Sequence, residues 1–565
     1  MNSTVVATGA EPDGQVPADD GPAAPEPSHR RVRPLWRVAA VIGLLAFVVR
    51  VWAPGPVTQT VDEYAWYMCS RAFRGAVVEG NLADASTSAI TGPWMTQPGV
   101  TTMWAGTLGY WAVAAGEELG VVEDAPGPRD DPPRILRGGR VVVSLWCALA
   151  LVALIVIAAK LIGRRAAVVA GVLLAAEPFL VGHSHVLHTD AMVTMFGALA
   201  IVSLAAACRD RASPVDRKLL AVAGAAAGLA ALTKLNGVPL VLGGAAVVLA
   251  VQTDWRRMGL AASVRRSALT GLAFVGVAAV AFFVVWPALW VDPWSQLERL
   301  PRSLDQLGRE NFTFFRARVT EEPGPLYYPY AMALRLSPWL LVAGAASVVA
   351  SVVHLARRAR SDDPTPWPAP PVLVLLLLAP LPYAVLIALT GQKYDRYALP
   401  VVPFLALLTG VGTVVAADRW SHRLLVPAGL AAAVAMFAVT VTIQPYAISF
   451  ANPLLGGQKR ARNLILLGWG EGQEVLGAAI ARREERCGDV RIFTDQVVAD
   501  FIALPCGEVA SDTTTRPGDY VIRYISDVQR NPDDPIERAA MRRGELVEKV
   551  DIAGVTYAEL WQFPG

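Results

Sequence analysis

Charged residues are scarce in this chain of 565 residues. Asp, Glu, Lys and Arg make up only 17% of it, against 54% hydrophobic residues and a mean hydropathy of +0.41. A water-soluble protein of this length needs more charge on its surface, so the composition excludes an ordinary soluble domain and indicates a membrane protein. The formal net charge is +2, and so small an excess gives no basic field for binding nucleic acid.

Cysteines are few and scattered. None of the five forms a CxxC pair or joins a His/Cys cluster, which argues against a zinc site. Cys487 and Cys506 are candidates for a disulfide in an oxidising compartment, with two free thiols as the equal alternative. Residues 1–33 lack an apolar run and are rich in Pro, Ala, Gly and acidic residues. We predict a disordered cytoplasmic tail there, not a signal peptide.

Long apolar runs are the dominant feature of the sequence. Each covers about 20 residues, the length that crosses a bilayer as a helix. Residues 219–252 are read as two helices, since one helix of that length would measure about 50 Å against a hydrocarbon core of about 30 Å. Residues 100–116 carry two Trp and a Tyr and are expected to lie in the interface. About eleven spans are predicted, beginning near Leu35, Val141, Ala166, Ala191, Leu219, Val238, Ala268, Pro338, Val372, Ala398 and Leu424.

The short basic clusters fix an orientation. When the predicted spans alternate, the short Lys/Arg-rich loops all fall on the side of the N-terminus, which the positive-inside rule places in the cytoplasm. We therefore predict a transmembrane module over 34–443, in the cell (plasma) membrane, with long outer loops at 54–138 and 287–336. Residues 444–565 contain a helical stretch, Glu474–Glu485, and the strand-like segments Val490–Phe493, Tyr520–Tyr524 and Val555–Phe563. This pattern predicts a small extracytoplasmic α/β domain.

Two acidic clusters are placed outside the cytoplasm. Asp62 and Glu63 follow the first span among Val, Tyr and Trp residues, a setting in which buried carboxylates are retained mostly where they act. The alternative is a solvated pair at the membrane surface. The second cluster holds His183, His185 and Asp190, which are candidate ligands of a divalent cation. Its alternative is simple capping of the next helix by Thr189 or Asp190.

Cations accompany these carboxylates on the same predicted side. Lys234 lies in an outer turn, against the positive-inside trend, and suits the phosphate of a membrane lipid. Lys393 and Arg396 lie between two later spans, where Arg396 can bind phosphate or sugar hydroxyls in a bidentate manner. A snorkelling lysine and an interfacial girdle are the alternatives. Together, the carboxylates and cations indicate a reaction with an anionic leaving group.

Several motifs occur in order along residues 62–403. They are Asp62-Glu63, Gln97-Pro98-Gly99, Pro178-Phe179 leading to His188-Thr189-Asp190, Leu232-Thr233-Lys234 and Asp395-Arg396-Tyr397. With these motifs the chain resembles the GT-C fold glycosyltransferases related to the protein O-mannosyltransferases and the lipid A aminoarabinose transferase. Many relatives have His-Pro where this chain has Gln97-Pro98. The tail segment Gly468–Gly472 is similar to that of a bacterial subgroup.

The resemblance implies a membrane glycosyltransferase that moves a sugar, a mannose-like hexose or a pentose, from a polyprenyl-phosphate donor to an acceptor hydroxyl with inversion. Asp62 would be the general base, with Glu63 and Asp190 orienting the acceptor or a cation. No cofactor is certain, and a divalent metal stays open. The acceptor would be a protein, glycan or lipid, and grooves between the spans would hold the prenyl tail. Substrate contacts are assigned to Lys234, Lys393, Arg396, His185, His188 and Gln97.

A transporter or lipid flippase is the rival class. Such proteins have a similar number of spans, but they place charged or broken-helix residues at mid-membrane and often contain internal repeats. In this chain the predicted spans are nearly free of charge and the polar residues gather in the outer loops. The enzyme is therefore favoured.

Overall fold

The computed structural model describes residues 34–52, 59–87, 98–122, 132–210, 213–253, 258–307, 312–359, 370–391, 393–420, 422–484, 490–494, 508–510 and 513–564. The predictions for the tail 1–33, for Gln97 and for the Cys487–Cys506 pair fall outside the described residues.

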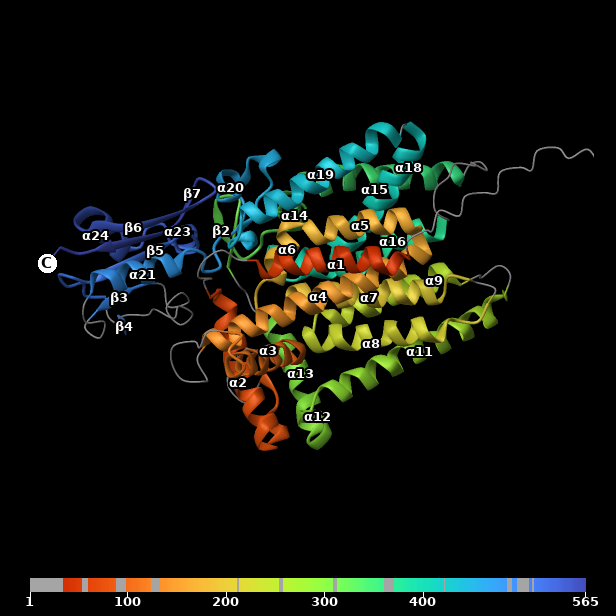
Figure 1. Cartoon of the computed structure of the whole chain (residues 1–565), viewed down its shortest axis with the longest axis horizontal. Helices are drawn as coiled ribbons and strands as arrows, with labels where there is room; N and C mark the ends of the chain where they lie inside the picture. Colours follow the sequence, from red (N-terminus) through yellow and green to blue (C-terminus); the bar gives the residue numbers. More distant parts are fainter. Residues whose placement is uncertain are drawn as a thin grey trace, which may run out of the picture. The chain divides into compact units, whose positions relative to one another are not determined.

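The described residues between 35 and 442 are mostly helical (Figure 1). Among the described residues a short 3₁₀ helix, η4 (Asp395–Val401), leads into α18. The helices are α1 Leu35–Val51, α2 Val61–Glu79, α3 Val100–Glu118, α4 Pro132–Ile162, α5 Arg164–Ala176, α6 Pro178–Ser184, α7 Asp190–Ala207, α8 Arg217–Thr233, α9 Gly237–Gln252, α11 Leu260–Val285, α12 Ala288–Val291, α13 Pro293–Leu307, α14 Tyr327–Arg335, α15 Pro338–Arg358, α16 Pro370–Leu378, α17 Leu381–Leu389, α18 Val402–Trp420 and α19 His422–Thr442.

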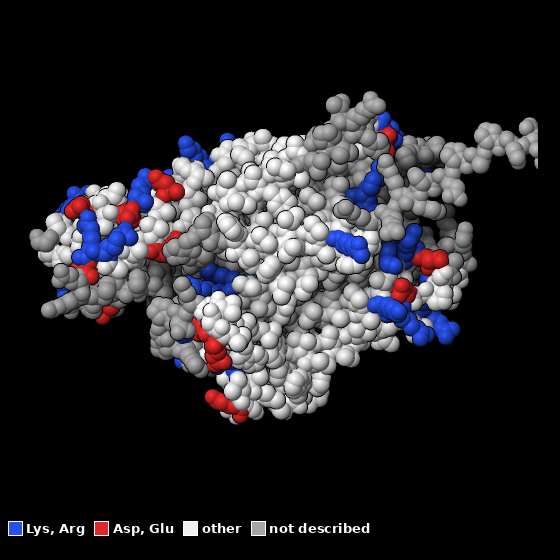
Figure 2. Space-filling model, in the orientation of Figure 1, with Lys and Arg blue, Asp and Glu red and all other residues white. Residues whose placement is uncertain are grey.

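The helices have the length and composition of a multi-pass membrane protein. Among the helices that the structure describes, six are long and apolar enough to cross a bilayer, or up to eight if each bent helix pair is counted as one span. All eleven start points predicted from the sequence fall within a helix. In the face shown in Figure 2, the surface over the helices is largely free of charge, whereas Lys, Arg, Asp and Glu gather at the ends. The exact number of spans stays a prediction.

Helix α7 forms the centre of the helical part. All of its residues are buried, and it packs against α4, α8, α9 and η4. Beside it, α3 and α4 approach closely through two glycines. A Cβ on Gly138 would lie 2.1 Å from the backbone of Gly109, and one on Gly109 the same distance from the backbone of Gly138. Glycine is therefore required at both positions for this helix contact.

The C-terminal part contains a five-stranded sheet with the order β4-β3-β5-β7-β6. Strand β3 is parallel to β4 and β5, whereas β7 pairs antiparallel with β5 and β6. This confirms the predicted small α/β region, although β4 and β6 were not predicted as strands. The elements are α20 Gly457–Ala461, α21 Gln473–Arg483, β3 Arg491–Phe493, β4 Glu508–Val509, β5 Tyr520–Tyr524, α23 Ile525–Arg530, α24 Pro535–Arg543, β6 Glu545–Ile552 and β7 Val555–Gln562.

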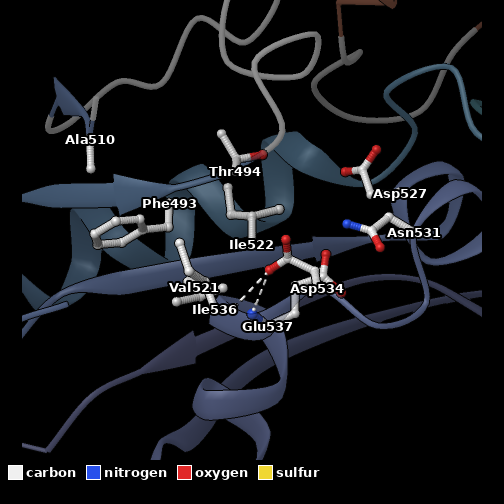
Figure 3. A pocket seen from close by; sticks show the side chains of 10 residues that line it. All are labelled: Phe493, Thr494, Ala510, Val521, Ile522, Asp527, Asn531, Asp534, Ile536 and Glu537. Carbon is white, nitrogen blue, oxygen red and sulfur yellow. Dashed lines mark hydrogen bonds between the residues drawn. The ribbon is translucent and has the colours of Figure 1, made fainter. Parts of the chain in front are cut away.

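This sheet region contains a cavity of about 200 Å³ with an apolar floor and an acidic rim (Figure 3). The floor includes Phe493, Val521 and Ile522, and the rim includes Asp527 and Glu537. The Glu537 carboxylate pairs with Arg523 at 3.3 Å, but its burial raises its pKa to about 8.

A small hairpin between α13 and α14 packs against the segment that follows α19. Strands β1 (Thr313–Phe315) and β2 (Arg318–Thr320) form the hairpin, in which Phe315 pairs with Ile465. The backbone N–H of Arg316 donates to the Leu464 carbonyl at 3.1 Å. The hairpin is therefore one of the points at which the C-terminal part is attached to the preceding chain.

Candidate active site

Asp62 is the second residue of α2, and its position is fixed by contacts around the helix start. The Glu63 carboxylate accepts from the Thr60 backbone N–H at 2.9 Å, and the Val61 N–H donates to the Trp469 carbonyl at 3.0 Å. An anionic side chain is favoured at this end of a helix by the helix dipole. The Asp62 side chain is 34% exposed, so its carboxylate remains within reach of a ligand.

Glu63, in contrast, is fully buried and has both oxygens occupied by the protein. Arg140 on α4 binds it in a bidentate manner, with Nε 2.7 Å from Oε1 and Nη2 2.5 Å from Oε2. The Leu187 N–H donates to Oε1 at 2.7 Å. Glu63 thus joins α2 to α4 and to the loop before α7. The predicted role of Glu63 in orienting the acceptor or a cation stays a prediction.

Asp190 is the first residue of α7 and is surrounded by cations. Lys234 Nζ lies 2.6 Å from Oδ1, while His188 Nδ1 and Arg396 Nε each lie 3.2 Å from Oδ2. The Thr189 side chain makes no capping hydrogen bond to α7. The side chains here form ion pairs rather than the simple cap considered as the alternative.

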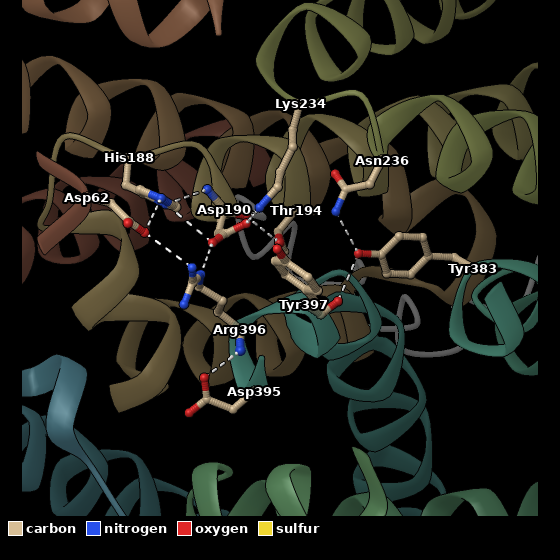
Figure 4. A network of polar contacts seen from close by, with 10 residues as sticks. All are labelled: Asp62, His188, Asp190, Thr194, Lys234, Asn236, Tyr383, Asp395, Arg396 and Tyr397. Atoms are coloured by element: carbon tan, nitrogen blue, oxygen red, sulfur yellow. Dashed lines mark hydrogen bonds and ion pairs between the residues drawn. The ribbon is translucent and has the colours of Figure 1, made fainter. Parts of the chain in front are cut away.

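His188 and Arg396 connect Asp190 to Asp62. His188 Nε2 lies 3.1 Å and Arg396 Nη2 3.2 Å from the same oxygen, Oδ2, of Asp62. Figure 4 shows the resulting cluster, which we call the charge network: Asp62, His188, Asp190, Lys234 and Arg396. It brings together residues from α2, the loop before α7, α7 itself, the α8–α9 turn and η4.

The charge network suits an anionic ligand. Two carboxylates balance Lys234 and Arg396, and a protonated His188 makes the sum +1. Burial alone would lower the pKa of His188, but the carboxylates of Asp190 and Asp62 raise it above 6.5. Burial would likewise raise the pKa of Asp62, but the charge of Arg396 and the hydrogen bond with His188 lower it to about 2. Asp62 is therefore ionised at neutral pH.

Two predicted substrate contacts lie outside the charge network. Lys393 Nζ donates to the carbonyls of Ala388 and Thr390 at 2.8 and 2.7 Å, which caps the C-terminal end of α17. His185 Nδ1 faces the carbonyl of Arg50 on α1. Both side chains thus contact backbone carbonyls within the protein, and their predicted substrate contacts stay predictions.

The predicted metal ligands are not gathered at one point. His183 packs its ring against Phe179 and Trp469, with centroids 4.7 and 5.4 Å apart. Within the described ranges, no group of three or more His, Cys, Asp and Glu side chains is arranged to hold a metal ion. His188 is the histidine that contacts Asp190, and a divalent metal stays a prediction.

Trp469 and Arg140 belong to the site but were not predicted to do so. The indole of Trp469 lies over the Arg396 guanidinium, 4.2 Å from the ring centroid. In the sequence, Trp469 is marked by the Gly-Trp-Gly-Glu-Gly segment, but nothing in a single sequence places that segment beside Asp62. Arg140 lies next to the predicted start of a span, and a buried arginine there implies a buried carboxylate partner.

Comparisons with known proteins agree with this picture. Residues 136–290 match the family model described as dolichyl-phosphate-mannose-protein mannosyltransferase. No curated protein matches the chain significantly. Among solved structures, ArnT from Cupriavidus metallidurans in the apo state has a TM-score of 0.50 and 15% identity, covering 93% of this chain and 97% of ArnT. The archaeal oligosaccharyltransferase AglB from Archaeoglobus fulgidus, in complex with an inhibitory peptide and a dolichol-phosphate, has a TM-score of 0.46 and 13% identity over 93% of this chain and 74% of AglB.

These comparisons confirm the expected fold and the resemblance found from the motifs. The chain is a multi-pass membrane protein whose fold is of GT-C type and similar to that of ArnT, and its residues 136–290 resemble the protein O-mannosyltransferases. The family match includes Arg140, His188, Asp190 and Lys234, whereas Asp62 and Arg396 lie outside it.

Proposed function

We propose that the chain is a glycosyltransferase that moves a sugar from a polyprenyl-phosphate donor to an acceptor hydroxyl, with inversion at the sugar. The observation that carries the proposal is the position of Asp62. It is the partly exposed carboxylate of the charge network, and cations from two other elements contact one of its oxygens. The match of residues 136–290 to the mannosyltransferase family supports the lipid-linked donor.

In the proposed reaction, Asp62 is the general base. It accepts the proton of the acceptor hydroxyl while the hydroxyl oxygen attacks the anomeric carbon. A carboxylate with a pKa of about 2 is a weak base, so its proton transfer accompanies formation of the new C–O bond. The bond between the anomeric carbon and the phosphate oxygen breaks at the same time, and the bonding pair leaves with polyprenyl phosphate.

The cations of the charge network would stabilise that leaving group. Arg396 reaches both carboxylates and presents a planar guanidinium suited to phosphate oxygens. Lys234 is held by Asp190 at 2.6 Å and adds a second buried positive charge. Fixed charges in a site shielded from water stabilise developing charge strongly, because they need no reorganisation during the reaction. We infer a mannose-like hexose or a pentose as the sugar, and a protein, glycan or lipid as the acceptor.

The test is transfer of radiolabelled sugar from polyprenyl-phosphate donors in membranes containing wild-type protein or Asp62→Asn. Loss of a general base lowers turnover by about 10²- to 10⁴-fold. Glu79→Gln is the matched control, because it removes an exposed carboxylate at the other end of the same helix. Transfer that depends on Asp62 but not on Glu79 would support the proposal.

Two outcomes would count against it. Unchanged transfer by Asp62→Asn would remove Asp62 as the base. Absence of transfer by folded wild-type protein from any of several donors would reject the glycosyltransferase and make lipid flipping the next activity to measure.

A further inference from the structure

The segment Gly468–Gly472 of the C-terminal part lies against the charge network. We propose that its Trp469 is a positioning residue for Arg396 and forms one wall of the site for the donor phosphate. The proposal rests on the function proposed above and assigns the C-terminal part a role in that reaction.

Trp469 contacts the charge network on several sides. The guanidinium carbon of Arg396 lies 4.2 Å from the centroid of its ring, and the His188 ring meets it edge-on at 5.5 Å. Tyr394 lies 4.2 Å from the same guanidinium carbon. Two aromatic rings therefore hold the Arg396 guanidinium, and arginine stacks on aromatic faces without losing its hydrogen-bonding edge. That edge faces the carboxylates of Asp62 and Asp190.

The backbone of Trp469 is fixed at both of its polar groups. Its carbonyl accepts from Val61 N–H, at the start of the helix that carries Asp62. Its N–H donates to the buried carboxylate of Glu471. That carboxylate also accepts from the hydroxyls of Tyr524 at 2.8 Å and Ser449 at 2.6 Å. Glu471 thus connects Trp469 to strand β5 of the sheet.

The neighbouring glycines are needed for this arrangement. Gly468 and Gly470 have φ angles of +93° and +107°, which L-residues with a side chain rarely adopt. A Cβ on Gly468 would also lie 2.7 Å from the ring of Tyr524. The Gly-Trp-Gly-Glu-Gly segment is therefore built to hold one tryptophan at a defined place.

Trp469 also has a surface left for a ligand. The residue is half-buried, so part of its ring is accessible. A phosphate bound by Arg396 would lie beside this ring. The tryptophan would then affect the affinity for the phosphate through the orientation of Arg396.

The experiment compares Trp469→Leu, which keeps apolar bulk but removes the aromatic face, with Trp469→Phe, which keeps a ring. The full-length protein in nanodiscs is titrated with polyprenyl phosphate, and transfer is measured on the same samples. We expect Trp469→Leu to weaken binding and lower kcat/KM about tenfold, and Trp469→Phe to stay within about threefold of wild type. Trp294→Ala is the control, since Trp294 is 76% exposed.

A second measurement separates the positioning of Arg396 from a general loss of structure. In an Arg396→Met background, the additional effect of Trp469→Leu on phosphate affinity should disappear, because the group that Trp469 positions is gone. Equal affinity and transfer for wild type and Trp469→Leu would overturn the inference, as would Leu and Phe variants that lose affinity equally. Wild-type protein that binds the phosphate but transfers no sugar would instead refute the proposed function.

Discussion

The ion pair between Arg140 and Glu63 gives a sharp prediction about stability. Replacing Arg140 by Met removes the bidentate partner of a carboxylate whose side chain is fully buried. Two backbone N–H groups, of Thr60 and Leu187, would remain as its hydrogen-bond donors. They do not neutralise its charge.

We expect Arg140→Met to lower the free energy of unfolding by about 3–5 kcal/mol, the range found when one partner of a buried ion pair is removed. Arg165→Met is the matched control. Arg165 binds Asp418 with similar geometry, at 2.9 and 2.8 Å, but its side chain is 62% exposed. Exposed pairs contribute about 0–1 kcal/mol. Unfolding of both variants by SDS, followed by circular dichroism, would measure the two values in parallel.

The pH dependence provides an independent check. In the wild type, burial alone would raise the pKa of Glu63, but the charge of Arg140 lowers it below 4.5. The stability from this group is therefore present above pH 4.5 and is lost as the pH falls through the lowered pKa. Without Arg140, burial would raise the pKa of Glu63, so the variant should approach the wild type as the pH falls.

Equal destabilisation by Arg140→Met and Arg165→Met would refute this reasoning. A constant difference between Arg140→Met and wild type from pH 7 to pH 4 would do the same. The double variant Glu63→Gln/Arg140→Met should recover part of the loss, because no buried charge is left unpaired.

Two further predictions concern the same region. The pKa of His188 is raised, so the stability from its ion pairs should be complete below pH 6.5 and be lost as the pH rises through the raised pKa. His188→Gln should therefore flatten the dependence of thermal stability on pH above 6.5. Gly138→Val would place a side chain against the backbone of Gly109 and should destabilise the protein by about 1–3 kcal/mol or more, measured by SDS unfolding. The control is Gly75→Ala, at a glycine with open space around it, which should stay near the wild type in stability.

The sequence predicted the helices better than it predicted the contacts between them. Apolar runs determine where helices form, and each predicted start point lies within a helix, although the spans predicted from Ala166 and Val372 each fall on two short helices. The boundaries were less accurate. The span expected near Val141 belongs to α4, which begins at Pro132 and holds Arg140 in its buried part. Strand β6, Glu545–Ile552, was missed because its charged residues hide the alternation of a strand at the edge of a sheet.

The candidate site was predicted in part. Asp62, Asp190, Lys234, Arg396 and His188 were all proposed from the motifs, and the structure brings them together. Their pairing was not predictable, because contacts between separate helices leave no local pattern. Lys393 shows the converse. Its charge and its neighbourhood in the sequence resembled those of Arg396, but its ammonium group donates hydrogen bonds to backbone carbonyls only three to six residues away in the chain.

The contact between Trp469 and the start of α2 has a consequence for how the protein is made. About 400 residues separate Val61 from the carbonyl that accepts its N–H. At a synthesis rate of about 5–20 residues per second, the N-terminal helices would wait about 20–80 s for this partner. A chain that stops after α19 would retain the charge network but lack the ring stacked on Arg396. The site would then be completed only late in biosynthesis, and a nascent chain that lacks this segment should have reduced activity.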